Sequence, residues 1–341
     1  MTELFGLSLQ DLQALCEAES MPKFTARQIA NWLYDKRVDS IDAMTNLSLK
    51  QRARLKEICT LRHTYPADCQ VSTDGTKKYI FDVGDRRLVE TVFIPDGDRA
   101  TLCVSCQVGC KMGCRFCVTG SQGFHGSLSA YDILNQIFAI PEFSRLTNIV
   151  YMGMGEPFDN YDAVMRSIEV LTSGWGLGWS PHRITVSTVG VVPGIERFLH
   201  DCDCHLAISL HNPIADERLS IMPMQKTYPI AKVVAKLKEY DWSGQRRLSF
   251  EYTMFGGLND DLSHAESLVR LLKPLHCRVN LIRFHTSPDT PFHTSPLNTM
   301  QQFMDYLVNH GIRCTIRASR GEDIMAACGL LAGSVPERAE R

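Results

Sequence analysis

Hydrophobic positions change their spacing along the chain, and the first 65 residues carry them at helical intervals. One apolar stripe of this period runs from 26 to 34, and Thr25 in front of it is a residue type that caps helices. Ser48 precedes a second stripe of the same kind. We therefore expect residues 1–66 to form a small helical accessory domain.

From residue 79 onward the pattern changes to the shorter period of strands. Residues 79–83 and 88–94 indicate two strands around the polar turn 84–87. They predict a β-hairpin within a linker that covers residues 67–95.

Beyond residue 96, short β runs alternate with amphipathic segments such as 131–140 and 262–272. The expected strands are 101–106, 148–152, 183–187, 205–210, 248–253, 278–283 and 313–316. Repeated βα units predict an α/β fold in which helices cover a parallel sheet. The number of units suits an incomplete TIM-like (β/α)6 barrel over 96–333, with its chemistry at the carboxyl ends of the strands. Residues 334–341 read as a polar tail.

Composition adds constraints on class and compartment. The 341 residues are 44% hydrophobic and 22% charged, which is typical of a soluble globular protein. No apolar run approaches the roughly 18 residues of a membrane span, and the N-terminus lacks a signal-peptide pattern. Thirteen cysteines, an odd number, argue against a disulfide framework and for a reducing cytoplasm.

Charge says little about partners, since the formal net charge is −2. Between Lys50 and Arg62, five basic residues stand against one acid, Glu57. Such a stripe is either a phosphate-binding surface or a solvated helix face, and the sequence leaves both open.

The most informative chemistry is the spacing C-x3-C-x2-C of Cys110, Cys114 and Cys117. Three thiolates this close in one loop can hold three irons of a 4Fe–4S cluster and leave the fourth iron open to a small molecule. Structural zinc is the competing metal, but it usually takes four ligands in two separated pairs. With Phe116 inside the last pair, the loop resembles that of the radical S-adenosylmethionine (SAM) superfamily, in which SAM binds the open iron.

Further segments narrow the resemblance. They are Val89-Glu90-Thr91-Val92, Thr101-Leu102-Cys103-Val104-Ser105, Met152-Gly153-Met154-Gly155-Glu156-Pro157, Ser209-Leu210-His211 and Ala326-Ala327-Cys328-Gly329. Together with the cysteine loop they resemble the RlmN/Cfr family of radical SAM methyltransferases, which act on adenosine in RNA. The resemblance runs from about residue 20 to 333. It implies a radical SAM core over 96–333 and an RNA-binding role for the accessory domain.

The resemblance also implies a mechanism that consumes two SAM per turnover. A ring carbon of adenine is electron-poor, so a carbon radical replaces polar methyl transfer. Cys328 matches the cysteine that carries the methyl group and becomes joined to the RNA. Cys103 matches the cysteine that resolves this adduct through a transient disulfide. Glu90 matches the carboxylate that accepts the ring proton.

Each of these residues also has an ordinary interpretation when it is judged by itself. Cys328 and Cys103 would be packed small hydrophobes, and Glu90 would be a solvent-facing strand residue. Only the combination with the cluster loop favours the catalytic roles.

For SAM itself, Gly155 and Glu156 resemble the motif that contacts the methionine amino group. The glycine allows close backbone approach, and the carboxylate accepts from an ammonium. The remaining family positions of this pocket fall on Ser187, Ser209, Leu210, His211 and His285. Some relatives carry asparagine at the position of His285.

Three further cysteines raise alternatives. Cys106 stands where serine is common in relatives, so it is either inert filler or a competitor in disulfide exchange. Cys202 and Cys204 flank Asp203 beside His205, but a C-x-C-H motif without partners is weak evidence for a metal site.

The leading functional hypothesis is methylation of adenosine carbon 2 in 23S rRNA, at the peptidyl transferase centre, and in tRNA, 3′ of the anticodon. The alternatives are methylation at carbon 8, as in the Cfr branch, a non-catalytic iron–sulfur RNA-binding protein, and an enzyme that generates a glycyl radical in a partner. Residues Gln122-Gly123-Phe124 after the cluster loop favour carbon 2. An electron donor such as flavodoxin, a monomeric state and a cytoplasmic location complete the expectation.

Overall fold

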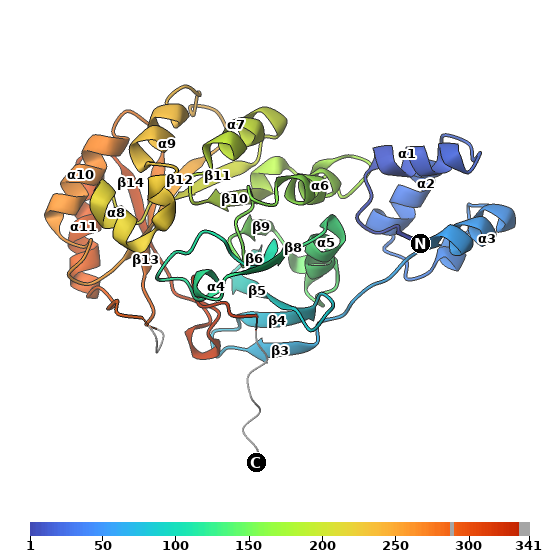
Figure 1. The fold of residues 1–341 in the computed structure, drawn as a ribbon, viewed down its shortest axis with the longest axis horizontal. Helices are drawn as coiled ribbons and strands as arrows, with labels where there is room; N and C mark the ends of the chain where they lie inside the picture. The colour runs from blue at the N-terminus through green and yellow to red at the C-terminus, as the bar shows by residue number, and fades with distance from the viewer. Residues whose placement is uncertain (287–289, 334–341) are drawn as a thin grey trace, which may run out of the picture.

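The computed structural model describes residues 1–286 and 290–333, and the expected polar tail 334–341 lies outside these ranges. Helices α1 (Leu9–Ala18), α2 (Thr25–Ala30) and α3 (Leu49–Ile58) form a lobe beside the rest of the chain (Figure 1). The short strands β1 (Thr2–Glu3) and β2 (Cys59–Thr60) pair in parallel within it. The lobe confirms the expected helical content of the N-terminal residues.

The two helix starts that the sequence indicated differ in outcome. Ser48 caps α3, since its hydroxyl accepts from Gln51 N–H and the Gln51 side chain accepts from Ser48 N–H. The expected cap at Thr25 is wrong, because α2 begins at Thr25 itself and Phe24 precedes it without a side-chain cap. The buried Thr25 hydroxyl instead accepts from Gln51 Nε2 at 3.3 Å and joins α2 to α3.

The larger part of the chain is built on one sheet that has ten strands within the described residues. Seven of them run parallel: β6 (Arg99–Cys103), β9 (Asn148–Tyr151), β10 (Ile184–Thr188), β11 (His205–Ser209), β12 (Leu248–Met254), β13 (Arg278–Arg283) and β14 (Arg313–Arg317). They are adjacent in chain order, so six βα units precede β14 and the predicted (β/α)6 arrangement is confirmed. Figure 1 shows the curved row of strands with helices outside it.

The helices that connect these strands are α4 (Val118–Ser121), α5 (Ala130–Phe138), α6 (Tyr161–Thr172), α7 (Val192–Asp201), α8 (Ala215–Ile221), α9 (Ile230–Leu237), α10 (Leu262–Leu272) and α11 (Leu297–Asn309). Shorter helical turns are η1 (Asn31–Asp35), η2 (Ile41–Ala43), η3 (Phe143–Arg145), η4 (Pro181–Arg183), η5 (Pro223–Lys226) and η6 (Glu322–Ile324). Buried apolar residues such as Ile208, Phe250 and Leu268 form the core between strands and helices. No helix in the described residues has the length and apolar character needed to cross a bilayer.

The expected hairpin is part of the same sheet. Strands β4 (Lys77–Asp82) and β5 (Leu88–Asp96) pair antiparallel, and β5 pairs with β6 so that Val92 lies opposite Cys103. A third strand, β3 (Asp68–Val71), extends the edge. The sequence did not indicate β3, because its residues Asp-Cys-Gln-Val are partly exposed and carry no apolar run.

The chain returns to this extension after β14. Asp74 Oδ2 accepts from Gly321 N–H at 3.0 Å, and Asp323 accepts from Thr73 N–H at 3.0 Å and from the Ser72 hydroxyl. These bonds dock residues 318–333, which we call the C-terminal segment, against β3 and β4. Ala327 and Cys328 of this segment line a pocket together with Cys103 of β6, the first strand of the barrel.

Candidate active site

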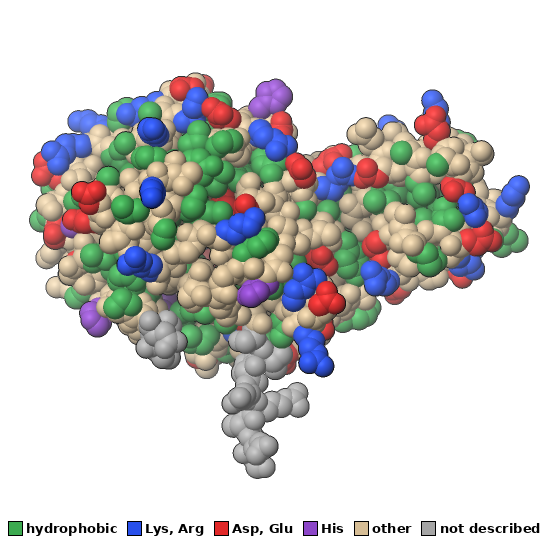
Figure 2. Space-filling model, viewed as in Figure 1, with side chains coloured by type: hydrophobic (Ala, Val, Ile, Leu, Met, Phe, Trp, Pro, Cys, Tyr) green, Lys and Arg blue, Asp and Glu red, His purple; other side chains and the backbone are tan. Residues whose placement is uncertain are grey.

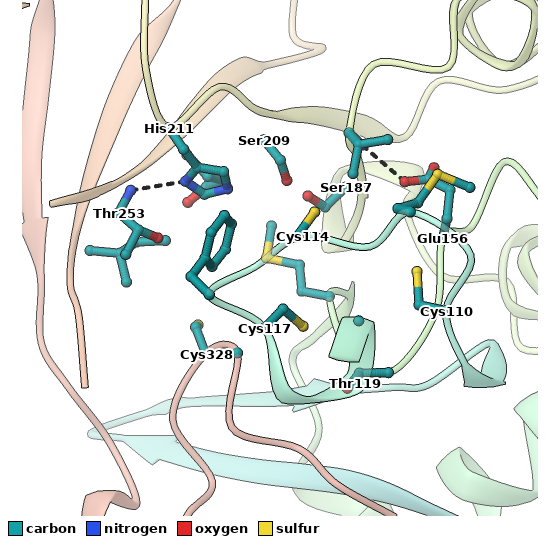
Figure 3. A pocket seen from close by; sticks show the side chains of 18 of the residues that line it. Cys110, Cys114, Cys117, Thr119, Glu156, Ser187, Ser209, His211, Thr253 and Cys328 are labelled. Carbon is teal, nitrogen blue, oxygen red and sulfur yellow. Dashed lines mark hydrogen bonds between the residues drawn. The ribbon is translucent and has the colours of Figure 1, made fainter. Parts of the chain in front are cut away.

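The cysteine loop follows β6 at the carboxyl end of the barrel. It starts with β7 (Gln107–Gly109), which pairs with β8 (Phe124–Ser127). Cys110 N–H donates to Gly123 O at 2.8 Å. Gly109, at φ +73°, permits this contact, because a Cβ there would lie 1.9 Å from the Gly123 oxygen. The structure brings Cys110, Cys114 and Cys117 to the wall of one pocket (Figure 3).

This pocket, which we call the cluster pocket, encloses about 950 Å³ of space that is partly open to solvent. Besides the three cysteines, its lining includes Thr119, Gly155, Glu156, Ser187, Ser209, His211, Glu251, Thr253, Arg317 and Cys328. Six of the barrel strands or the loops that follow them contribute these residues. The pocket thus lies where the fold concentrates its chemistry.

The thiols need a compensating charge before they can ionise. Burial and, to a smaller extent, neighbouring thiols raise the pKa of all three, to about 12 for Cys110. Cysteine binds metal as the thiolate, so a bound metal group has to supply the positive charge. Within the described residues, no three His, Cys, Asp or Glu side chains converge on the position of a single ion. The three thiols line the wall of one pocket and, once ionised, offer the sulfur ligands that an iron–sulfur cluster takes.

Gly155 and Glu156 form the floor next to Cys110. Gly155 has φ +102°, and a Cβ there would lie 2.6 Å from the Gln107 Cβ, so only glycine fits. Glu156 is 2% exposed, and its carboxylate accepts from Val189 N–H at 2.9 Å and from Phe158 N–H at 3.2 Å. Burial raises the pKa of Glu156 to about 7 despite these bonds. A cationic ligand in the pocket would favour the ionised form.

His211 lies on the opposite wall, where its ring packs edge-on against Phe116 with centroids 4.8 Å apart. Its Nδ1 accepts from Thr253 N–H at 3.0 Å, which leaves the proton on Nε2. Burial, with Arg218 nearby, lowers the pKa of His211 to about 3, so the ring is neutral. Its backbone at φ +57° is held by Asn259, whose amide donates to the His211 carbonyl.

Of the other residues expected to bind SAM, only two line the cluster pocket. Ser187 and Ser209 line the cluster pocket from the ends of β10 and β11 (Figure 3). Leu210 is fully buried and lines no described pocket, and its carbonyl accepts from the buried Arg218. His285 lines a second pocket instead, where its Nε2 lies 2.8 Å from Ser319 Oγ.

The second pocket, which we call the thiol pocket, adjoins the first and encloses about 1080 Å³. Cys103 at the end of β6 and Cys328 in the C-terminal segment both line it. Cys328 also lines the cluster pocket, so its exposed side chain stands where the two pockets meet. Desolvation by the walls of the two pockets raises the pKa of both thiols, to about 12 for Cys103, and Arg317 counteracts this rise.

Glu90 is 1% exposed and lines neither pocket, which contradicts a solvent-facing strand position. Its Oε2 accepts from Ala332 N–H at 3.0 Å, and its Oε1 lies 3.5 Å from Lys78 Nζ. Burial raises the pKa of Glu90, while Lys78 and the Ala332 N–H lower it. Because Val92 lies opposite Cys103, Glu90 shares the face of the sheet that carries Cys103.

Hydrogen bonds tie the cluster loop to the C-terminal segment directly. Val118 N–H donates to Gly329 O at 2.8 Å, and the buried Thr119 hydroxyl donates to Leu331 O at 2.6 Å. Gln122 Nε2 donates to Ala332 O at 2.8 Å. The residues just after Cys117 therefore hold the residues just after Cys328.

Sequence reasoning missed Glu251, Thr253 and Arg317. Glu251 is 3% exposed, accepts from Asn280 Nδ2 at 2.8 Å and lies 3.5 Å from the Arg317 guanidinium. A signal was present, since polar residues occupy alternate positions of β12 from Ser249 to Thr253 and so share one face. That face turns into the barrel.

The remaining sequence candidates take ordinary places. Cys106 is 2% exposed and lines neither pocket, so it fits the filler interpretation. Cys204 is buried and Cys202 half-buried. The basic run on α3 is largely neutralised: Arg54 pairs with Glu19 at 2.6 Å and Lys56 with Asp42 at 2.8 Å. Figure 2 shows the resulting mixture of both charges on this lobe.

The C-x3-C-x2-C loop on a six-unit α/β barrel, with polar groups at the strand ends, defines a radical SAM enzyme. Comparisons of this chain with protein families and solved structures agree with this class. Residues 104–272 match the family model of the radical SAM superfamily, and residues 2–61 match the ribosomal RNA large subunit methyltransferase N-terminal domain. A crystal structure of a radical SAM methyltransferase from Sphaerobacter thermophilus superimposes with a TM-score of 0.90 at 41% identity, covering 98% of this chain and 100% of that one.

Curated relatives give the family. A protein of Phocaeicola vulgatus named probable dual-specificity RNA methyltransferase RlmN is 55% identical, over 97% of this chain and 95% of its own length. The dual-specificity RNA methyltransferase RlmN of Syntrophus aciditrophicus is 42% identical, over 97% and 96%. The chain belongs to the RlmN family of radical SAM methyltransferases.

Proposed function

We propose that this protein methylates carbon 2 of adenosine in two RNAs: 23S rRNA, at the peptidyl transferase centre, and tRNA, 3′ of the anticodon. The single observation that carries the proposal is the place of Cys328 at the junction of the cluster pocket and the thiol pocket. One thiol there can meet SAM on one side and a substrate base on the other. The dual specificity follows the names of the relatives.

In this proposal Cys110, Cys114 and Cys117 hold one 4Fe–4S cluster whose fourth iron is open to S-adenosyl-L-methionine. When bound, the cluster and SAM supply the one-electron chemistry that functionalises an adenine carbon. Glu156 receives the methionine ammonium, and Gly155 provides the space for it. The neutral His211 keeps Nε2–H as a donor on the opposite wall.

Cys328 and Cys103 carry the protein's own covalent steps. Cys328 holds the methyl group as a thioether and becomes joined to the base through that carbon. The Cys103 thiolate then attacks the Cys328 sulfur, which releases the methylated base and leaves a Cys103–Cys328 disulfide. Arg317 supports this step, because its positive charge counteracts part of the rise in pKa that desolvation causes at both thiols. A cellular reductant restores the thiols.

Glu90 accepts the proton that leaves the ring. Since Glu90 lines neither pocket and Ala332 N–H occupies one of its oxygens, a local rearrangement that frees this oxygen precedes proton transfer. Burial raises the pKa of Glu90, which makes the carboxylate a better proton acceptor.

The N-terminal lobe contributes RNA contacts. The electron donor is a partner protein such as flavodoxin, and the enzyme acts as a cytoplasmic monomer. The family model matched by residues 2–61 supports the first of these points. The ion pairs of Arg54 and Lys56 make exposed neighbours such as Lys50 better candidates for phosphate contacts than the basic run as a whole.

The first experiment is nucleoside mass spectrometry, with authentic standards, on 23S rRNA and tRNA from a methyltransferase-null host that expresses this protein. 2-Methyladenosine in both RNAs is the expected result. 8-Methyladenosine would assign the carbon 8 activity instead. Unmodified RNA from cells whose protein holds its cluster would favour a non-catalytic RNA-binding protein or a radical enzyme acting on another substrate.

Substitutions test the two thiols separately. Cys328→Ala should abolish methylation while iron content and SAM cleavage persist. Cys103→Ala should accumulate a covalent protein–RNA adduct, visible as a shifted band on a denaturing gel. Cys106→Ala is the matched control, because Cys106 is a buried thiol close in sequence that lines neither pocket. An adduct-free Cys103→Ala enzyme with normal turnover would remove Cys103 from the mechanism.

A further inference from the structure

A third cavity lies at the opposite end of the barrel, where the strands begin, and the proposed function makes no use of it. It comprises about 910 Å³ of space that is partly open to solvent, and residues at the starts of four neighbouring strands line it. His205 begins β11, Arg247 directly precedes β12, Arg278 begins β13 and Arg313 begins β14. His182 of η4 closes one side.

The lining is strongly cationic. Four arginines and three histidines line the cavity, and none of its described lining residues is acidic. Arg246 has a structural role, since it donates to Leu199 O at 3.0 Å and pairs with Asp203 at 3.1 Å. The other three arginine side chains make no hydrogen bond or ion pair with any residue the structure describes. Their charge is available to a ligand.

Strand register holds these charges close together. Arg278 and Arg313 lie directly opposite each other on adjacent parallel strands, an arrangement that like charges disfavour. Arg247 precedes β12, two residues before Ser249, which is the register partner of Arg278. Burial, together with Arg247 and Arg313, lowers the pKa of Arg278. A bound anion would relieve this repulsion.

His205 adds a fixed hydrogen-bond donor. It is 7% exposed, and its Nδ1 accepts from Arg247 N–H at 3.0 Å, so the proton resides on Nε2. Its ring stacks on that of His182 with centroids 5.4 Å apart. Burial and the surrounding cations lower the pKa of His205 to about 4, which keeps the ring neutral.

We propose that this cavity binds the phosphate groups of a polyphosphate ligand through Arg247, Arg278, Arg313 and His205. Guanidinium forks match phosphate oxygens, and the paired positions of Arg278 and Arg313 lie on strands about 4.8 Å apart. Such a pair can hold one phosphate from two sides or two phosphates in succession. The backbone of an RNA and the phosphate chain of a free nucleotide both present this chemistry. The inference is independent of the proposed adenosine chemistry.

The test is calorimetric titration of sodium tripolyphosphate into three cluster-loaded proteins. They are the wild type, Arg278→Gln/Arg313→Gln, and the control Arg270→Gln/Lys273→Gln, which removes the same charge from the exposed end of α10. We expect one ligand per chain. Loss of roughly tenfold in affinity per guanidinium makes the double variant about a hundredfold weaker, and the control stays near wild type.

Equal affinity in the double variant and the wild type, or no wild-type binding at millimolar ligand, overturns the proposal. Iron content and melting temperature equal to wild type verify that the double variant is folded. Binding of tRNA as a function of salt separates the two sources. If the cavity binds an RNA backbone, the slope of log K for tRNA binding against log salt concentration is about two units smaller for the double variant than for the wild type. If the cavity binds a free nucleotide, the double variant binds tRNA as the wild type does, and it loses binding of nucleoside triphosphate together with binding of tripolyphosphate.

Discussion

Replacing Thr119 by valine tests whether the cluster loop positions Cys328. The two side chains have similar shapes, so the change removes mainly the hydroxyl that donates to Leu331 O at 2.6 Å. Thr119 is 3% exposed, and a buried carbonyl left without a donor costs about 1–3 kcal/mol. At about 1.4 kcal/mol per factor of ten, local opening of the C-terminal segment becomes roughly 5- to 150-fold more frequent.

Hydrogen exchange followed by mass spectrometry measures that opening at the Ala332 amide, which donates to Glu90. We expect exchange to accelerate by the same factor. Methylation should fall roughly tenfold to a hundredfold, because a displacement of about 1 Å of a reacting group has this effect. Iron content should not change. Ser121→Ala is the control, since its hydroxyl donates to Val118 O on the same helix and does not contact the C-terminal segment. Faster exchange with undiminished methylation would refute the positioning role.

Three further predictions concern the buried charges and the tight backbone. Gly155→Ala should abolish SAM binding in an equilibrium assay, because its Cβ would overlap a neighbouring side chain, whereas Gly174→Ala, with open space around it, should bind normally. Burial raises the pKa of Glu156 to about 7 in the folded protein. The protonated side chain therefore contributes to the free energy of unfolding fully below about pH 4.5, and this contribution is lost as the pH rises through about 7. In urea titrations of the cluster-free protein, the free energy of unfolding of Glu156→Gln should therefore rise by about 3 kcal/mol relative to that of the wild type between about pH 5 and pH 8. A difference between the two proteins that does not change with pH would contradict this. Lys78→Met should lower the free energy of unfolding by about 3 kcal/mol at neutral pH, because it leaves the Glu90 carboxylate buried without a cation. The double variant with Glu90→Gln should recover most of that loss, and failure to recover would show that the lysine acts through packing.

The periodic elements of the fold were accessible from the sequence. The expected bounds 278–283 and 262–272 coincide with β13 and α10. Strand 101–106 ends earlier, at Cys103, because Cys106 N–H bonds to Met154 O of the next loop and leaves the ladder. The edge strand β3 was missed because pairing with β4, and not its own composition, makes it a strand.

Parts of the candidate site were accessible in the same way. Strand-end residues such as Ser187 and Ser209 reach the cluster pocket as expected, since the carboxyl ends of parallel strands meet at one face. Residues of irregular segments were harder to place. His285 lines the thiol pocket and Leu210 points into the core, because a loop side chain has no period from which its direction follows.

The sequence by itself determined the chemistry that is local in the chain. Residues 110–117 hold three cysteines close together through chain connectivity alone, and the repeated βα period implies a barrel for them to sit on. Only the tertiary structure decided how distant segments meet: that Cys328 joins two pockets, that Glu90 is buried beneath Ala332, and that Arg278 faces Arg313. The reason is that strand register and docking of the C-terminal segment depend on packing summed over the whole barrel, and no short stretch of sequence encodes that sum.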